Sequence, residues 1–225
     1  MSLSSLVNES DTIKSNYNEK DVWLINGADL EGGGQVLRNV TTYASLYYHK
    51  VYIYNIRGKR SKPGLKRQHL CGLKLLAQLS GPNSILESCI LNSTSIYFQP
   101  GQWLNNINHN YLCGDIQSAG AITLILQCIT PLFLFNTNLQ LKIHIKGGTH
   151  TFYAPSIDTI QDILLPILKQ HCQLSLQINV IKRGFFPKGY GHIILQEEQV
   201  VKEIKPITLI KPGPLSKIIV KIIIA

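Results

Sequence analysis

The sequence predicts an α+β fold in which a βαβαββ unit is repeated in tandem, with helices packed on one face of each four-stranded sheet. Three observations support this prediction. Short β-branched and aromatic runs alternate with longer stretches whose apolar residues recur at helical spacing. The same order of segments returns after about 90 residues. Finally, 44% hydrophobic and 16% charged residues in a chain of 225 exclude a disordered protein and suffice for one large or two small domains.

The first unit is expected over residues 21–103, where the helices have recognisable starts and stops. Glycines precede the first helix, Pro63 suits the first turn of the second, and Gly81-Pro82-Asn83 ends it. The expected elements in chain order are strand 22–25, helix 36–47, strand 51–56, helix 63–80, strand 85–91 and strand 95–99.

The second unit is expected over residues 104–198 and repeats this order. Two of its strands alternate strictly between apolar and polar residues, as a sheet with one solvent-facing side requires. The expected elements are strand 108–116, helix 119–135, strand 139–146, helix 157–168, strand 174–180 and strand 191–196.

The two ends of the chain fall outside these units. Residues 1–20 are polar and are expected to form a disordered tail. Residues 199–225 are expected to begin a third, incomplete repeat, with a proline-containing connection over 201–214 and a strand over 217–225. Because an apolar terminal strand would have nothing after it to pair with, we expect that the chain is cut short.

Composition excludes several classes of protein. Thr123, Gln127, Thr130 and Pro131 interrupt the most apolar stretch, which favours a buried helix over a membrane span. The first residues lack the pattern of a signal peptide, so we expect a soluble intracellular protein with no membrane partner. Five cysteines without a CxxC pair argue against a zinc site or a disulfide framework. The net charge of +9 favours a polyanionic partner such as nucleic acid or nucleotide.

The first candidate site is the segment from Asp29 to Arg38, in which Gly32, Gly33 and Gly34 stand between a strand and a helix. Three glycines let a ligand approach the backbone closely and leave helix N–H groups free for an anion. The segment is not a P-loop, because the Lys-Ser/Thr ending is missing. A flexible turn would explain the glycines equally well.

The second candidate site is the cationic segment 56–69, which carries six positive charges and no acidic residue. Crowded positive charges repel one another unless an anion neutralises them, and the forked guanidinium of Arg matches phosphate oxygens. A solvated loop or a localisation signal are the alternatives. The six cationic residues are Arg57, Lys59, Arg60, Lys62, Lys66 and Arg67.

These two segments together form a family signature. The chain resembles the RNA 3′-terminal phosphate cyclases, in the cyclase branch, whose pattern includes EGGGQ-x-L-R followed by IR-x-x-RS-x-PGL-x-x-QHL. Here the first motif spans residues 31–38 and the second spans 56–70, and the resemblance covers roughly residues 22–225. Members of this family contain three βαβαββ repeats, which agrees with the duplicated unit. The further matching segments are 115–127, 146–149, 154–158 and 183–189.

The resemblance implies a ligase-type enzyme of RNA processing. It would use ATP to convert an RNA 3′-terminal phosphate to a 2′,3′-cyclic phosphodiester, through enzyme–AMP and RNA–phosphoanhydride–AMP intermediates. Its partners would be RNA 3′-phosphate ends, its cofactors ATP and Mg²⁺, and its compartment the nucleus (nucleoplasm), with the cytoplasm as the alternative. The residues specify no oligomeric state.

The resemblance also implies roles for individual residues. Three arginines would hold phosphates, and Glu31 would position an arginine, a metal or a hydroxyl. Gln127 and Pro155 would line the nucleotide pocket. Without the resemblance, Gln127 is interpreted as a buried, hydrogen-bonded core residue of its apolar helix, and Pro155 as a turn residue. No set of metal-ligand residues is predicted. The implied catalytic residues are Glu31, Arg38, Arg57, Arg60 and Gln68, and the implied cofactor-binding residues are Gln127, Pro155, Gly32, Gly33 and Gly34.

The chain departs from the family pattern in three ways. His150 stands where relatives usually have a small polar residue, and Tyr190 replaces a glycine. The family's nucleophilic histidine lies in the third repeat, so it is absent from this chain and activity of the chain is in doubt. None of its seven histidines is expected to replace that nucleophile. The alternatives are a non-catalytic RNA-binding relative, similar to the cyclase-like protein of ribosome biogenesis, or an inactive fragment.

Overall fold

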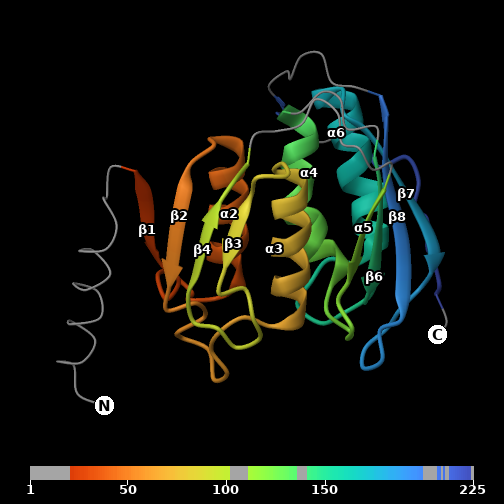
Figure 1. The fold of residues 1–225 in the computed structure, drawn as a ribbon. Coiled ribbons are helices and arrows are strands. Elements are labelled where there is room, and N and C mark those ends of the chain that lie inside the picture. Colours follow the sequence, from red (N-terminus) through yellow and green to blue (C-terminus); the bar gives the residue numbers. More distant parts are fainter. Residues whose placement is uncertain are drawn as a thin grey trace.

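The computed structural model describes residues 21–101, 111–135, 141–199, 207, 208, 210 and 213–223. Figure 1 shows two four-stranded sheets with helices between them. In the first unit the elements are β1 (Val22–Asn26), α2 (Gly34–Leu46), β2 (Lys50–Tyr54), α3 (Arg67–Leu79), β3 (Ile85–Glu87) and β4 (Ile96–Gln99). In the second they are β5 (Tyr111–Asp115), α4 (Ile122–Phe135), β6 (Lys142–Gly147), α5 (Ile157–Thr159), the π-helical η1 (Ile160–Leu164), α6 (Leu165–Cys172), β7 (Ser175–Lys182) and β8 (Gly191–Gln199).

The two sheets have the same topology. Their strand orders are β1-β2-β4-β3 and β5-β6-β8-β7. In each sheet the first pair is parallel, and the other two pairs are antiparallel. This correspondence confirms the predicted α+β fold with tandem βαβαββ units. The exact boundary between the units stays a prediction, because residues 102–110 lie outside the described part of the chain.

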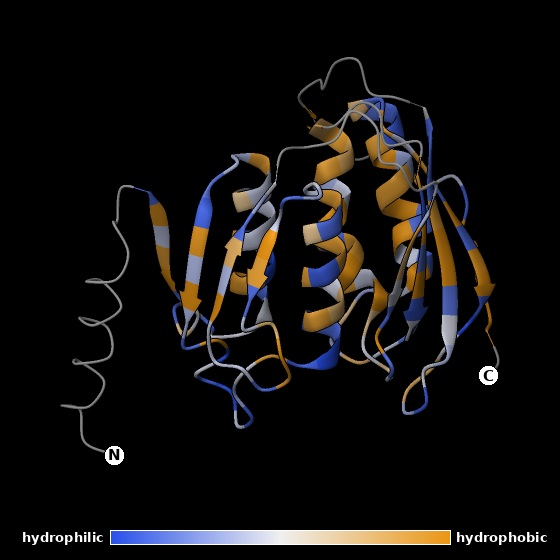
Figure 2. Ribbon diagram, viewed as in Figure 1, coloured by the Kyte–Doolittle hydropathy of each residue, from blue (hydrophilic) through white to orange (hydrophobic). Residues whose placement is uncertain are grey.

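The two units share one hydrophobic core. Helix α4 packs against α2 and α3, and α3 also contacts β5, so the helices of both units meet between the sheets. Figure 2 shows that α4 is apolar along most of its length. On β6, Ile143 and Ile145 are fully buried, whereas Lys142 and Lys146 are exposed. The strict alternation in the sequence therefore does mark one buried and one solvent-facing side.

Two element boundaries differ from the prediction. Helix α3 begins at Arg67 rather than near Pro63, because Gly64 and Leu65 donate their backbone N–H groups to Ile56 and Ser93 instead of continuing a helix. Strand β3 ends at Glu87 rather than at residue 91, and the next residue, Ser88, has φ +56°. These differences arise from contacts between loops, which local sequence patterns do not encode.

The predicted terminal strand 217–225 is wrong over its described residues. Residues 213–223 form no strand with any described part of the chain. Lys221 instead reaches Asp158 and Asp162 on the second unit, with Nζ–oxygen distances of 3.1 and 2.7 Å. The predicted tail 1–20 and the last two residues lie outside the described range. Among the described helices, none has the length and apolar character needed to cross a bilayer.

Candidate functional site

A cavity of about 920 Å³ lies where the two units meet. One side is formed by α2, α3 and the loop between β2 and α3, and the other by the loops around residues 118–121, 151–153 and 186. Among the described residues that line the cavity, none is acidic. Its electrostatic potential is therefore strongly positive, and an anion is the ligand that would relieve the repulsion. Its five cationic residues are Arg38, Arg57, Arg60, Lys66 and Arg67.

The three glycines let cationic and polar side chains lie directly over the start of α2. A Cβ on Gly33, the N-cap, would stand 2.7 Å from Nη2 of Arg60. A Cβ on Gly34, the first helical residue, would stand 2.5 Å from Nε2 of His69. Gly34 lines the cavity, whereas Gly32 and Gly33 do not. The glycines thus leave room for side chains of the protein itself, whereas the prediction was that they leave room for a ligand.

Arg38, which lines the cavity, connects the two units. Its Nε donates to Oε1 of Gln127 on α4 at 3.0 Å. Burial lowers the pKa of the Arg38 guanidinium from its ordinary value. The expectation that Gln127 is buried is wrong: this residue is exposed on the side of α4 that reaches Arg38. Arg38 and Gln127, for which the resemblance implies different roles, are thus in direct contact.

The loop after β2 orients two more arginines. Arg57 has φ +57°, and its Nη1 donates to the carbonyl oxygens of Lys62 at 2.7 Å and Gly64 at 3.1 Å. Burial, and then the nearby charge of Arg60, lower the pKa of Arg57. Nη2 of Arg60 lies 3.6 Å from Oε2 of Glu31. Of the three roles expected for Glu31, this contact matches the positioning of an arginine.

His69 is a cavity residue that the predicted site did not include. It is buried, and its Nδ1 accepts the backbone N–H of Lys66 at 3.0 Å. Burial, and then Arg57, Arg38 and Lys66, lower the pKa of His69 to about 3. The imidazole is therefore neutral at pH 7 and carries its proton on Nε2. That atom can donate to an anion, but it has no lone pair with which to attack one.

Gln68 and Arg67 hold the second unit in place. Oε1 of Gln68 accepts the backbone N–H of Ala121 at 3.1 Å, immediately before α4. Nη1 of Arg67 donates to Oε1 of Gln117 at 2.9 Å. Gln68 therefore uses its carbonyl oxygen to position the loop 118–121, which forms part of the cavity wall.

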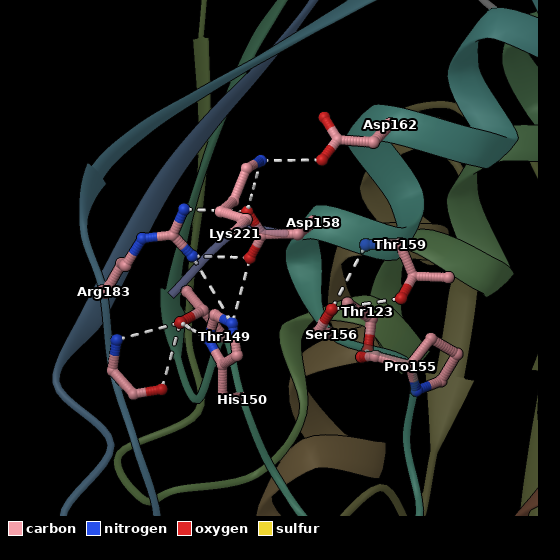
Figure 3. Close-up of polar contacts among 11 residues, drawn as sticks. Thr123, Thr149, His150, Pro155, Ser156, Asp158, Thr159, Asp162, Arg183 and Lys221 are labelled. Carbon is pink, nitrogen blue, oxygen red and sulfur yellow. Dashed lines mark hydrogen bonds and ion pairs between the residues drawn. The ribbon is translucent and has the colours of Figure 1, made fainter. Parts of the chain in front are cut away.

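Pro155 does not line the cavity, and it is exposed. Its carbonyl oxygen accepts the hydroxyl of Thr123 at 2.9 Å, which ties its loop to the first turn of α4. Figure 3 shows Pro155 and Thr123 beside the ion-pair cluster around Asp158. Of the ten predicted site residues, the cavity is lined by Gly34, Arg38, Arg57, Arg60 and Gln68, but not by Glu31, Gly32, Gly33, Gln127 and Pro155.

Asp158 is the centre of a cluster of polar contacts in the second unit (Figure 3). Asp158 accepts from both terminal nitrogens of Arg183, at 2.6 and 2.8 Å, and its Oδ2 lies 3.0 Å from Nε2 of His150. Hydrogen bonds from Arg183 lower the pKa of Asp158 well below its usual range, despite the opposing effect of burial, and Lys221 adds to the lowering. Asp158 is therefore a carboxylate at neutral pH.

Comparison with known proteins identifies the family of the chain. The sequence profile of the RNA 3′-terminal phosphate cyclase family matches residues 29–223. The chain belongs to this family. Cyclase relatives include a probable RNA 3′-terminal phosphate cyclase of Dictyostelium discoideum, which is 35% identical over 206 residues, 90% of this chain and 46% of the relative.

Two archaeal proteins, each named RNA 3′-terminal phosphate cyclase, are also similar. The Staphylothermus marinus protein is 32% identical over 194 residues, 86% of this chain and 52% of the relative. The Sulfolobus acidocaldarius protein is 40% identical over 169 residues, 75% of this chain and 48% of the relative. The chain spans about half the length of the curated cyclases that it matches.

Two of the three predicted departures from the family pattern, at His150 and Tyr190, fall on described residues and differ in their surroundings. Nδ1 of His150 lies 2.9 Å from the hydroxyl of Thr149, and its ring stacks on Phe185 at a centroid distance of 4.8 Å, so this residue links its own loop to the loop that carries Phe185. Tyr190 has φ +60° and is exposed. The left-handed region favours glycine, so the backbone at Tyr190 is strained.

Proposed function

We propose that this chain provides the nucleotide- and phosphate-binding part of an RNA 3′-terminal phosphate cyclase. The observation that supports this function is the gathering of five cationic side chains around one cavity, with no acidic residue among the described residues of its lining. A triphosphate or an RNA 3′-phosphate brings several negative oxygens into a small volume. Forked guanidinium groups match such oxygens in both charge and geometry.

The proposed reaction is the ATP-dependent closure of a 2′,3′-cyclic phosphodiester. A histidine would take AMP from ATP with release of diphosphate, the AMP would pass to the RNA 3′-phosphate, and the neighbouring 2′-hydroxyl would displace it. Each step concentrates charge on phosphoryl oxygens. Arg38, Arg57 and Arg60 would neutralise that charge, and the Nε2–H of His69 would donate one further hydrogen bond.

The adenylated histidine is not assigned to any described residue. His69 is the one histidine among the described residues that line the cavity, and it presents a protonated Nε2. We therefore propose that His69 binds phosphate rather than forming the AMP adduct.

Mg²⁺ would depend mainly on the nucleotide for its ligands. The described residues contain no cluster of three or more metal-ligating side chains. Glu31 is the one carboxylate among the predicted site residues and is largely exposed, so it would leave Arg60 to complete a shell of phosphate oxygens and waters. When bound, the ion would supply further neutralisation of phosphoryl charge.

The nucleus, with the cytoplasm as the alternative, stays a proposal from the family resemblance.

Direct binding of ATP tests the function. We expect Arg60→Ala to weaken ATP binding about 10- to 100-fold, because it removes one charge-assisted contact from the cavity. Lys142→Ala is the matched control: it removes the same charge from the exposed side of β6 and should leave the affinity within about twofold. Equal effects of the two substitutions, or no ATP binding by the wild-type chain, would contradict the proposal.

A further inference from the structure

We propose that Phe152 and Phe186, with Tyr153 at the rim, form a stacking surface for the bases at the end of a single-stranded RNA. This inference rests on the proposed function, because it requires that the RNA phosphate lie among the arginines of the same cavity. It adds a base-binding region on the second unit to the phosphate-binding region on the first. No role was predicted for these three aromatic residues.

The three aromatic side chains are unusually exposed for residues that line a cavity. Phe152 is 71% exposed, Phe186 is 59% exposed and Tyr153 is fully exposed. The rings of Phe152 and Phe186 lie 5.3 Å apart at 63°, which is an edge-to-face pair. Leaving this much aromatic surface in water is unfavourable, so a ligand with flat apolar faces would gain by covering it.

The aromatic pair is held in place before any ligand binds. Phe152 follows a segment whose Thr149 and His150 both donate backbone N–H groups to the carbonyl oxygen of Gly184. The Thr149 hydroxyl also bonds to both backbone polar groups of Gly184, at 3.0 and 3.1 Å. The loops that carry Phe152 and Phe186 are therefore joined directly, and stacking on them requires little additional ordering.

The Asp158 cluster stabilises the connection between these two loops. Asp158 pairs with Arg183, which immediately precedes Gly184, and also contacts His150 (Figure 3). The His150 ring in turn stacks on Phe185, next to Phe186. Both aromatic loops are thus anchored to the same partly buried carboxylate.

The combination of aromatic and cationic residues indicates single-stranded nucleic acid. Stacking of bases on aromatic rings beside a positively charged groove is the usual way to bind unpaired strands. Bases in a duplex already stack on one another and do not offer their faces. Because the aromatic rim is open to solvent, it can accommodate a strand that continues beyond the cavity. A mononucleotide could use the same rings, so the test separates the two ligands.

The test measures fluorescence anisotropy of a labelled, 3′-phosphorylated decaribonucleotide with the full 225-residue chain. We expect Phe152→Leu and Phe186→Leu each to weaken binding about five- to 100-fold, because leucine keeps apolar volume but cannot stack on a base. Tyr111→Leu is the matched control: Tyr111 is 62% exposed on β5 and does not line the cavity. It should change the affinity by less than about twofold.

An oligonucleotide whose last residues are abasic provides a test without any substitution in the protein. Wild-type protein should bind the abasic strand as weakly as the leucine variants bind the intact strand. For the leucine variants, replacing the intact strand by the abasic one should lower the affinity little further. Equal wild-type affinity for abasic and intact strands would overturn the stacking surface. ATP should bind to the leucine variants with the same affinity as to the wild type. If the substitutions weaken ATP binding more than RNA binding, the rings bind the mononucleotide and the proposal is overturned.

These outcomes also separate the two proposals. If wild-type protein binds neither ATP nor the 3′-phosphorylated strand, the proposed function fails and the stacking surface fails with it. If both ligands bind and the leucine variants behave as wild type, the stacking surface alone is wrong. A Phe152→Trp variant adds a direct signal, because an RNA base stacked on the indole should quench its fluorescence whereas inorganic diphosphate should not.

Discussion

Asp158 provides the sharpest test of how the cavity wall is held together. Its side chain is 14% exposed and contacts Arg183, which is 31% exposed, His150 and Lys221. In Asp158→Asn the side chain keeps its shape but loses its charge, and Arg183 loses its ion-pair partner and one of the two oxygens that accept from its terminal nitrogens. Breaking a fully buried pair costs about 3–5 kcal/mol. Because Arg183 is partly solvated, we expect a loss of about 2–3 kcal/mol in the free energy of unfolding.

Urea denaturation at pH 7 measures this loss, which should also appear as a fall in Tm of about 4–12 °C. Asp162→Asn is the matched control: this carboxylate is 55% exposed, has Lys221 as its one ion-pair partner among the described residues, and should lose less than about 1 kcal/mol. A loss below 1 kcal/mol for Asp158→Asn, or equal losses for the two variants, would refute the role assigned to Asp158.

The effect of Asp158 should also depend on pH. Its pKa is lower in the folded protein than in the unfolded chain, so its contribution is fully present above the unfolded pKa of about 4. It should be lost as the pH falls from there toward the folded pKa. The stability difference between wild type and Asp158→Asn should therefore shrink as the pH is lowered below about 4, and a constant difference would contradict the assignment.

Two further predictions concern the glycines and an unpaired acid. Gly34→Ala should displace His69 and weaken ATP binding about tenfold, because the new Cβ would lie 2.5 Å from Nε2 of His69. Isothermal titration measures this change. The control is Gly213→Ala, whose Cβ would meet nothing within 4 Å. Glu197 has no hydrogen-bond partner in the described part of the chain, and burial raises its pKa to about 7. Since the raised pKa lowers stability as the pH rises from about 4.5 to 7, Glu197→Gln should raise the free energy of unfolding by about 1 kcal/mol at pH 8 and not at pH 4. Thermal scans at both pH values check this, and a gain at pH 4 of the same size would contradict it.

Much of the fold was predictable because local patterns coincide with burial. The alternation around Ile143 and Ile145 marks a strand with one buried side, and the same order of elements in both halves predicts the duplicated topology. The start of α3 was not predictable in the same way. Gly64 and Leu65 are held by bonds to Ile56 and Ser93, which become neighbours only when the chain has folded.

The cationic half of the site was predictable, and the aromatic half was not. Arg57 and Arg60 lie in one short segment whose charge is unbalanced in the sequence itself. Phe152 and Phe186 are 34 positions apart (186 − 152) and meet because Thr149 joins their loops through Gly184. The exposure of Gln127 was not predicted because α4 is apolar along most of its length. Its sequence therefore gives no signal for the side that contacts Arg38.

Salt dependence of RNA binding tests most directly whether the cavity binds phosphate. The measurement compares a 3′-phosphorylated oligoribonucleotide with its 3′-hydroxyl counterpart between 50 and 300 mM salt, for wild type and an Arg57→Ala/Arg60→Ala variant. We expect the wild type to prefer the phosphorylated end and the variant to lose that preference. The slope of log affinity against log salt should fall by about 1.4 units, or roughly 0.7 for each charge removed. Equal affinity of wild type for the two ends, with the same slope in both proteins, would contradict phosphate binding at this site.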